Sequence, residues 1–190
     1  GRPCADRTRA RADRALGERG RRGHRSRARS PLGPELLDER ALAAARLPGR
    51  LERFSAGETP VVLDGAHTPA SAEGCLRELL ADPSLPGRPV VILGMAREKD
   101  LAGILKALAG RADRVICTSA GSALHRTPEQ IASAVGDAGM ASETAADPRM
   151  ALEQALSSAA RSGGWVLAIG SLYLAGELRP HLKKTDRAPC

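Results

Sequence analysis

Short runs of apolar residues alternate with longer amphipathic segments along most of this chain. The apolar runs cover residues 61–63, 90–93, 115–117 and 165–169, and polar residues interrupt none of them. Continuous runs of this length are typical of strands that are covered on both faces. We therefore predict four buried strands, and a weaker one over residues 140–145 in the wide gap before the last run.

The segments between these runs predict helices with recognisable first residues. Asp100 stands before a set of residues with the i, i+3, i+4, i+7 spacing of a helix, namely Leu101, Ile104, Leu105 and Leu108. The sequence TPEQ at residues 127–130 combines a threonine cap, a proline in the first turn and a capping-box glutamine. Asp147 and Pro148 repeat this arrangement, and another helix is expected over residues 37–45.

This alternation predicts the fold class and the edge at which a ligand would bind. Strands alternating with helices form an α/β fold with a mainly parallel sheet and helices on both faces. Ligands of such sheets bind outside the carboxyl ends of the strands. We expect residues 64–68, 94–100, 118–126 and 170–171 to lie along that edge.

Each polar residue at this edge also has a simple structural explanation. Asp64 either forms an Asp-Gly turn or accepts hydrogen bonds from a ligand. His67 is either a loop histidine or a contact for phosphate or carboxylate beside a helix N-terminus. Ser171 suits the cap of a last helix, Asp100 caps its own helix, and Lys99 reads as solvated charge.

Charge and composition change the picture only at the N-terminus. The first 32 residues hold eleven arginines against three acidic residues, which leaves 18 basic and 19 acidic residues in the rest of the 190-residue chain. Residues 1–34 form an Arg-rich low-complexity tail without apolar periodicity, which we expect to be disordered or foreign to the natural domain. The alternatives are an RNA-binding arm and an organelle transit segment. The scarcity of aromatic residues argues against nucleic acid as a partner, and Asp6, Asp13 and Glu18 argue against a transit segment.

Several function classes find no support in the sequence. The four cysteines form no C-x-x-C pair, so neither a zinc site nor a disulfide framework is predicted. No apolar run approaches the ~20 residues of a membrane span, and a cytoplasmic location is the expectation. Phosphate-binding loops of the G-x-x-x-x-G-K-[ST] and G-x-G-x-x-G types are absent.

Six segments, taken in order, carry a resemblance to a known family: LPGRLERF, VVLDGAHTPASAEG, VILGMAREKDLAGIL, HRTPEQI, DPRMALEQAL and AIGSLYLAGELR. They resemble the C-terminal domain of folylpolyglutamate synthase and dihydrofolate synthase, within the Mur ligase superfamily. The likeness covers about residues 35–182, so we assign residues 35–185 to a Mur ligase C-terminal-like domain. It implies a Rossmann-like fold, in agreement with the alternation of strands and helices.

The resemblance implies an activity and its cofactors. The family joins L-glutamate to the γ-carboxylate of a folate, or to dihydropteroate, after ATP has converted the acceptor carboxylate into an acyl phosphate. Mg²⁺ offsets the charge gathered at that centre. The phosphate-binding loop and the magnesium ligands belong to the family's N-terminal domain, so no metal site is expected in this segment. The chain alone is therefore expected to be inactive and to need that domain as a partner.

The resemblance also implies roles for four residues. Arg50 and Asp64 match residues associated with ATP, because a guanidinium suits phosphate and a carboxylate suits ribose hydroxyl groups. His67 and Ser171 match residues on the glutamate and phosphate side of the cleft, and His67 is the catalytic candidate. Thr68 departs from the family, which usually has asparagine there, and puts the surroundings of His67 in doubt.

Two rival functions stay open at this point. The first is a peptidoglycan-precursor ligase of the same superfamily, whose comparable motif usually has aromatic or acidic residues before the Ala-His pair. The second is a non-catalytic module with a basic RNA-binding arm.

Overall fold

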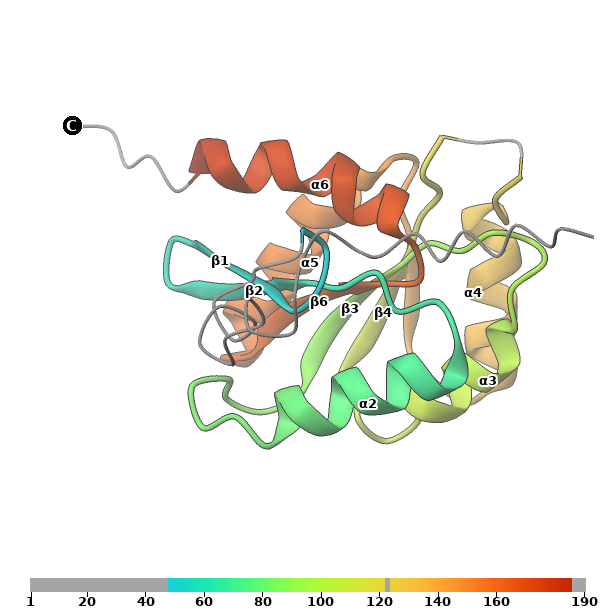
Figure 1. The fold of residues 1–190 in the computed structure, drawn as a ribbon, viewed down its shortest axis with the longest axis horizontal. Coiled ribbons are helices and arrows are strands. Elements are labelled where there is room, and N and C mark those ends of the chain that lie inside the picture. The colour runs from blue at the N-terminus through green and yellow to red at the C-terminus, as the bar shows by residue number, and fades with distance from the viewer. Residues whose placement is uncertain (1–47, 122–123, 186–190) are drawn as a thin grey trace, which may run out of the picture. The chain divides into compact units, whose positions relative to one another are not determined.

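The fold is a six-stranded sheet between two layers of helices (Figure 1). The structure is a computed structural model that describes residues 48–121 and 124–185, without side chains for residues 183–185. The Arg-rich tail, the helix expected over residues 37–45 and the domain start at residue 35 lie outside the described residues.

The strands run in the order β1-β2-β6-β3-β4-β5 across the sheet. All neighbouring pairs are parallel except the antiparallel β1–β2 hairpin. The strand bounds are Glu52–Ala56 (β1), Thr59–Leu63 (β2), Pro89–Leu93 (β3), Arg114–Cys117 (β4), Ser142–Thr144 (β5) and Trp165–Ile169 (β6). The four predicted buried strands and the weak fifth are confirmed, whereas β1 was not predicted.

The five described helices each follow a strand in sequence. Their bounds are Pro69–Leu80 (α2), Leu101–Leu108 (α3), Pro128–Asp137 (α4), Pro148–Ser162 (α5) and Leu172–Thr185 (α6). The caps act as the sequence predicts: Asp100 accepts from Gly103 N, Asp147 accepts from Met150 N, and Thr127 forms a capping box with Gln130. Within the described ranges, no helix is long and apolar enough to cross a membrane.

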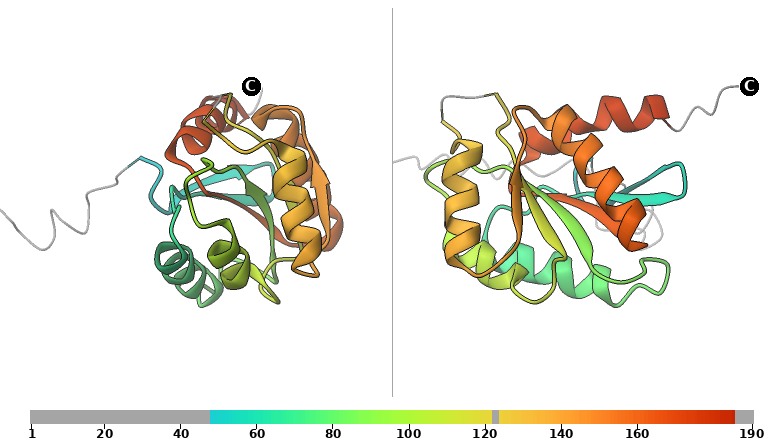
Figure 2. Two further views of the ribbon diagram at one scale, coloured as in Figure 1. Left: turned by 90° about the vertical axis from the view of Figure 1, so that its right-hand side faces the viewer. Right: turned by 180° about the vertical axis from the view of Figure 1, so that it is seen from behind.

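The alternation of side chains along each strand divides the core into two clusters. On β3, Val91 and Leu93 pack with residues of α2, α3 and α4, whereas Val90 and Ile92 pack with residues of α5 and α6. Figures 1 and 2 show α2 and α3 together on one side of the sheet, with α5 and α6 together on the other. Because β3 and β6 are buried on both faces, these two strands hold the layers together.

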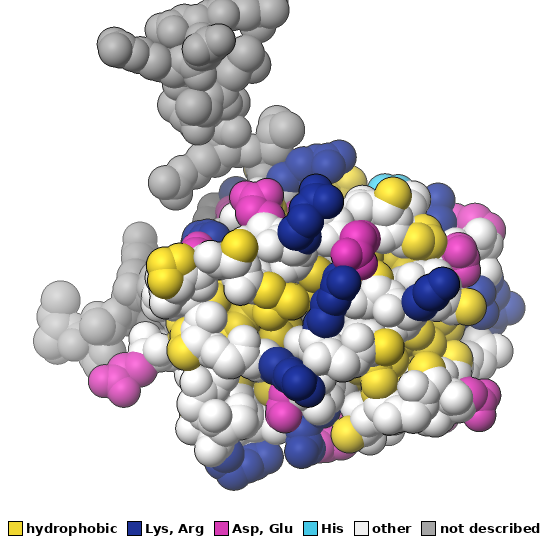
Figure 3. All heavy atoms as spheres, turned by 90° about the horizontal axis from the view of Figure 1, so that it is seen from below, with side chains coloured by type: hydrophobic (Ala, Val, Ile, Leu, Met, Phe, Trp, Pro, Cys, Tyr) yellow, Lys and Arg dark blue, Asp and Glu magenta, His cyan; other side chains and the backbone are white. Residues whose placement is uncertain are grey.

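The outer surface on the side of α2 and α3 carries charges of both signs. Figure 3 shows apolar side chains in the furrows of this face, with lysine, arginine and acidic side chains scattered over it. The pairs Arg111–Glu73 at 2.6 Å and Arg53–Asp82 are among the ion pairs of the described chain. Contacts with Ser84 and Arg53 lower the pKa of Asp82 to about 2. No single-sign charged patch marks this face as a binding surface.

Two glycines allow the carboxyl ends of the central strands to approach closely. Gly170 follows β6 with a φ of 105°, and its N–H donates to Ala66 O at 2.7 Å. A Cβ at this position would lie 2.6 Å from the carbonyl oxygen of Gly94, which follows β3. Close backbone contacts thus join the ends of β2, β3 and β6 at this edge of the sheet.

Substituting Gly170 by alanine is expected to destabilise the fold strongly. Both the positive φ and the contact with Gly94 O oppose a Cβ, so G170A should cost about 3 kcal/mol or more. Gly163 offers a matched control, since it has a φ of 67° but no atom within 4 Å of its Cβ position. G163A should cost about 1 kcal/mol. Urea unfolding of both variants measures the difference, and equal losses would show that the contact with Gly94 contributes nothing.

Candidate functional site

The turn after β2 is held by the carboxylate of Asp64. This residue is 9% exposed, and its backbone N–H continues the sheet by donating to Ala168 O at 2.9 Å. One carboxylate oxygen accepts from Ala66 N at 2.7 Å and the other accepts from Leu51 N at 2.9 Å. Asp64 therefore forms its own turn and also fixes a second turn that lies 13 residues earlier in the chain.

That second turn presents Arg50 to solvent. Gly49 and Leu51 on either side of it have positive φ values of 69° and 44°, and Gly49 O accepts from Gly65 N at 2.7 Å. Leu51 is the one non-glycine residue with positive φ among the described residues. Since Arg50 is exposed and has no hydrogen bond or ion pair within the described chain, its guanidinium is free to meet an anion.

Leu172, the first residue of α6, packs against both turns. A Cβ on Gly65 would lie 2.2 Å from the Leu172 side chain, and a Cβ on Gly49 would lie 3.1 Å from it. Glycine at both positions leaves room for this half-exposed leucine, so the two turns and the start of α6 pack together as one unit.

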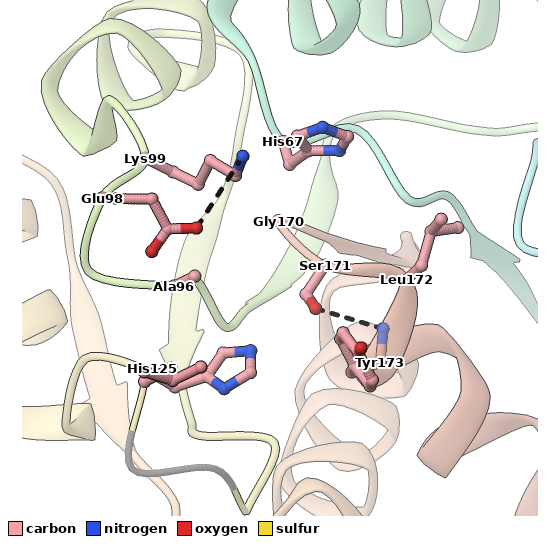
Figure 4. Close-up of a pocket in the computed structure, with 10 residues that line it drawn as sticks. His67, Ala96, Glu98, Lys99, His125, Gly170, Ser171, Leu172 and Tyr173 are labelled. Carbon is pink, nitrogen blue, oxygen red and sulfur yellow. Dashed lines mark hydrogen bonds and ion pairs between the residues drawn. The ribbon is translucent and has the colours of Figure 1, made fainter.

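A cavity of about 480 Å³ opens beside this unit at the carboxyl ends of the strands. All four predicted edge segments contribute to it, and Figure 4 shows how their side chains face one another. The lining residues are His67, Ala96, Glu98, Lys99, Leu124, His125, Gly170, Ser171, Leu172 and Tyr173. Its size is that of a small-molecule site.

His67 enters the cavity in a defined tautomer. Its Nδ1 lies 2.8 Å from Gly65 O, and a carbonyl oxygen can only accept, so Nδ1–H is the donor. In the neutral ring, Nε2 is then left as an acceptor. The half-buried imidazole thus presents Nε2 as the nitrogen that can accept a hydrogen bond or a proton.

Ser171 keeps one hydrogen-bonding capacity for a ligand. The side chain is 6% exposed, and its Oγ accepts from Tyr173 N at 3.1 Å, which caps the start of α6. The hydroxyl proton has no acceptor among the described residues and can be donated into the cavity.

Lys99 and Glu98 bring charge to the same cavity. The Lys99 Nζ lies 3.8 Å from Glu98 Oε1, and the two side chains are 38% and 66% exposed. At that distance and exposure the pair is weak, so Lys99 is available to an anionic ligand. Sequence reasoning read Lys99 first as solvated charge and did not count it among the site residues, although it lies on the predicted edge directly after β3.

The four predicted site residues thus divide into two groups. His67 and Ser171 line the cavity together, whereas Arg50 and Asp64 lie in the adjoining turns and do not line it. Glu98 and His125 lie within the predicted edge segments but were not singled out, and Tyr173 lies outside those segments and was missed. The assigned roles of the four predicted residues stay predictions.

The described residues supply neither a metal cluster nor an activated cysteine. Within these ranges no three His, Cys, Asp or Glu side chains are grouped as a metal site would require. Burial, with a smaller contribution from Asp64, raises the pKa of the Cys75 thiol to about 12. Burial alone raises that of Cys117 to about 12, so both stay neutral thiols.

The fold and the cavity define a Rossmann-like α/β domain with a cavity at the carboxyl ends of its strands. Residues 49–172 match the family model for the Mur ligase, glutamate ligase domain, and the chain belongs to this family.

Two curated relatives match at similar levels. The dihydrofolate synthase/folylpolyglutamate synthase of Escherichia coli is 35% identical over 97 residues, which are 50% of this chain and 22% of the relative. The UDP-N-acetylmuramoyl-L-alanyl-D-glutamate–2,6-diaminopimelate ligase of Thermosynechococcus vestitus is 34% identical over 132 residues, which are 64% of this chain and 26% of the relative. The chain thus spans about a quarter or less of either enzyme.

Solved structures agree with the fold. Mycobacterium tuberculosis folylpolyglutamate synthase complexed with ADP and AMPPCP has a TM-score of 0.66 and 31% identity, and the match covers 82% of this chain and 37% of that one. The bifunctional folylpolyglutamate synthase/dihydrofolate synthase of Yersinia pestis with Mn, AMPPNP and L-glutamate bound has a TM-score of 0.58 and 25% identity, with 73% and 32% covered.

Replacing Asp64 by asparagine should loosen both turns. An asparagine has one acceptor oxygen, so either Leu51 N–H or Ala66 N–H would face an NH₂ group in D64N. We expect a loss of about 1–3 kcal/mol in the free energy of unfolding, together with shifted NMR signals of these two amides.

Asp137 provides the matched control for D64N. It is exposed and has no partner within the described chain, so D137N should change stability by less than about 0.5 kcal/mol. If D64N unfolds at the same urea concentration as D137N, the two backbone hydrogen bonds do not hold the turns.

Proposed function

We propose that this domain forms the glutamate-side wall of an ATP-dependent ligase that adds L-glutamate to a folate. The observation that carries the proposal is that Lys99, Ser171 and His67 line one cavity. These three residues come from three separate loops. An ammonium and a hydroxyl donor suit a carboxylate, and an acceptor nitrogen beside them suits an amine. A free amino acid carries both groups on one carbon atom.

In this proposal the three side chains divide the work of positioning the amine. Lys99 and Ser171 bind the α-carboxylate of glutamate, which directs its amine toward the acceptor. The amine nitrogen forms a bond to the carbonyl carbon of the acyl phosphate, and phosphate leaves with the electrons of the broken C–O bond. His67 Nε2 takes the proton that the nitrogen loses, because its Nδ1–H is already held by Gly65 O.

In this proposal ATP binds beside the turn that carries Arg50, outside the cavity. Arg50 is exposed and has no partner within the described chain, so it can contact a phosphate group from the turn that Asp64 fixes. Asp64 itself is occupied by two backbone donors. We therefore assign it first to shaping the Arg50 turn and only through that turn to ATP. Mg²⁺ and folate would be held by the N-terminal ligase domain.

The peptidoglycan-precursor ligase is the second candidate, because a relative of that kind matches this chain at 34% identity. The two candidates differ in the acceptor, a folate or a UDP-linked peptide. The segment Asp64–His67 has the sequence DGAH, which favours the folate enzyme. The reaction with each acceptor decides between them.

A chimera tests the proposed function directly. Residues 48–185 would replace the corresponding domain of M. tuberculosis folylpolyglutamate synthase, and ATP-dependent addition of glutamate to a folate would be measured. We expect activity from the chimera and none from the 190 residues alone. No addition of glutamate by a folded chimera would contradict the proposal, as would turnover by the isolated chain.

Substituting Lys99 in that chimera tests the glutamate site more specifically than the activity of the chimera does. Removing a charged hydrogen-bond donor costs ~1.5–3 kcal/mol, so K99M should raise the KM for glutamate about tenfold or more. The KM for the folate should not change. Lys106 lies on α3 outside this cavity, so K106M is the matched control and should leave the KM for glutamate as it is. Equal KM values for the two variants would remove Lys99 from the site.

A further inference from the structure

The loops after β3 and β4 are joined by a short stretch of antiparallel pairing that places His125 in the cavity wall. Ala96 and His125 pair as an isolated bridge, and Arg126 N donates to Met95 O at 2.9 Å. These two loops are far apart in sequence, yet the pairing fixes the backbone of one against the other. His125 is therefore part of a cavity wall that both loops build.

Two arginine side chains fasten this pairing from both sides. Arg97 Nε donates to His125 O at 3.1 Å. Arg126, in return, donates from one terminal nitrogen to Arg97 O at 2.8 Å and to Lys99 O at 3.2 Å. The backbone at His125 and the backbone at Lys99 are thus bound by the same pair of arginines.

The imidazole of His125 is buried with an unmet hydrogen-bonding group. The residue is 6% exposed, and its ring meets the ring of Tyr173 edge-on, with centroids 6.1 Å apart and an interplanar angle of 82°. Its Nδ1 is buried and has no partner among the described residues. A buried polar atom left unpaired costs ~1–3 kcal/mol, and a partner that reached this nitrogen would remove that cost.

Figure 4 shows that His125 and His67 lie on opposite sides of the cavity, with Gly170 and Ser171 between them and Lys99 near His67. Polar groups therefore stand at two ends of the cavity. Glu98 opposes the charge of Lys99 within the same cavity, which limits what Lys99 alone contributes to binding an anion. A ligand with two carboxylates on a short chain fits two separated groups of donors.

We propose that His125 binds the side-chain carboxylate of the incoming amino acid and thereby makes the cavity select glutamate over its uncharged analogues. This assignment rests on the proposed function, in which Lys99 and Ser171 take the α-carboxylate. Tyr173 supports the ring of His125 from outside. The arginine pair positions it, and a bond from the imidazole to a carboxylate is of the charge-assisted kind.

The experiment is a titration of the 190-residue chain with L-glutamate and with L-glutamine, followed by NMR at the amides of the cavity. Glutamine has the same shape as glutamate and lacks the charge. We expect the wild-type chain to favour glutamate about tenfold, as a charge-assisted bond of this kind would give. The variant H125F keeps an aromatic ring against Tyr173 and should bring the ratio of the two affinities close to one.

Further variants separate a role in binding from a role in packing. The amide of H125N lies near the place of Nδ1 and that of H125Q near the place of Nε2, so one of them should recover part of the preference and identify the nitrogen. The same change at another histidine, H181F, lies outside the cavity and should leave the ratio unchanged.

The outcomes distinguish this inference from the proposed function. If glutamate still shifts the cavity amides of H125F and the preference over glutamine stays as in the wild type, the inference is wrong and the proposed function stands. If H125F does not fold, the ratios for H125N and H125Q decide, and two unchanged ratios would overturn it. If glutamate shifts no cavity amide of the wild-type chain, both proposals fail.

Discussion

The carboxylate of Asp64 is the point on which the geometry of this edge depends. Its two oxygens accept from Ala66 N and Leu51 N, so one buried side chain determines the path of two turns. Leu51 can hold its positive φ because that hydrogen bond, together with the contact between Gly49 and Gly65, leaves the turn no other path. The exposed position of Arg50 follows from this.

β1 and α6 secure the same turn from the opposite side. Glu52 of β1 accepts from Gly49 N at 3.0 Å and pairs with Arg179 of α6 at 2.9 Å. Leu172 of α6 packs against Gly49 and Gly65. The cavity wall that begins at Ser171 and the turn that carries Arg50 are thus linked through one helix, so the two halves of the proposed site cannot shift independently.

The donors of the cavity are oriented mainly by backbone groups. Gly65 O sets the tautomer of His67, Tyr173 N engages Ser171, and backbone carbonyl oxygens bind the two arginines around His125. Groups that are held this way do not need to reorganise when a ligand arrives, which is the main electrostatic advantage of a preformed site. Glycine at the tightest approaches makes the arrangement possible, because any side chain there would separate the strand ends.

Much of this architecture was predictable from local sequence patterns. The buried strands coincide with apolar runs in the sequence, and the helix starts follow from capping residues such as Asp100 and Thr127. β1 was missed because it lies at the edge of the sheet, where its half-buried residues alternate with exposed polar ones and form no apolar run. The burial of His125 was not predictable either. It depends on pairing with Ala96, which lies 29 positions away, and no local pattern encodes that contact.

The threonine that replaces the family's usual asparagine at position 68 illustrates the same division between local and long-range information. Threonine is a good helix cap, and Thr68 does form a capping box with Ser71 at the start of α2. What the sequence left in doubt was the neighbouring imidazole. His67 is oriented by Gly65 O, and the side-chain bonds of Thr68 go to Ser71. The tautomer and direction of His67 therefore do not depend on which capping residue stands beside it. An asparagine at this position would have added an amide at the helix start, whereas the ring that points into the cavity is held from the turn that Asp64 closes.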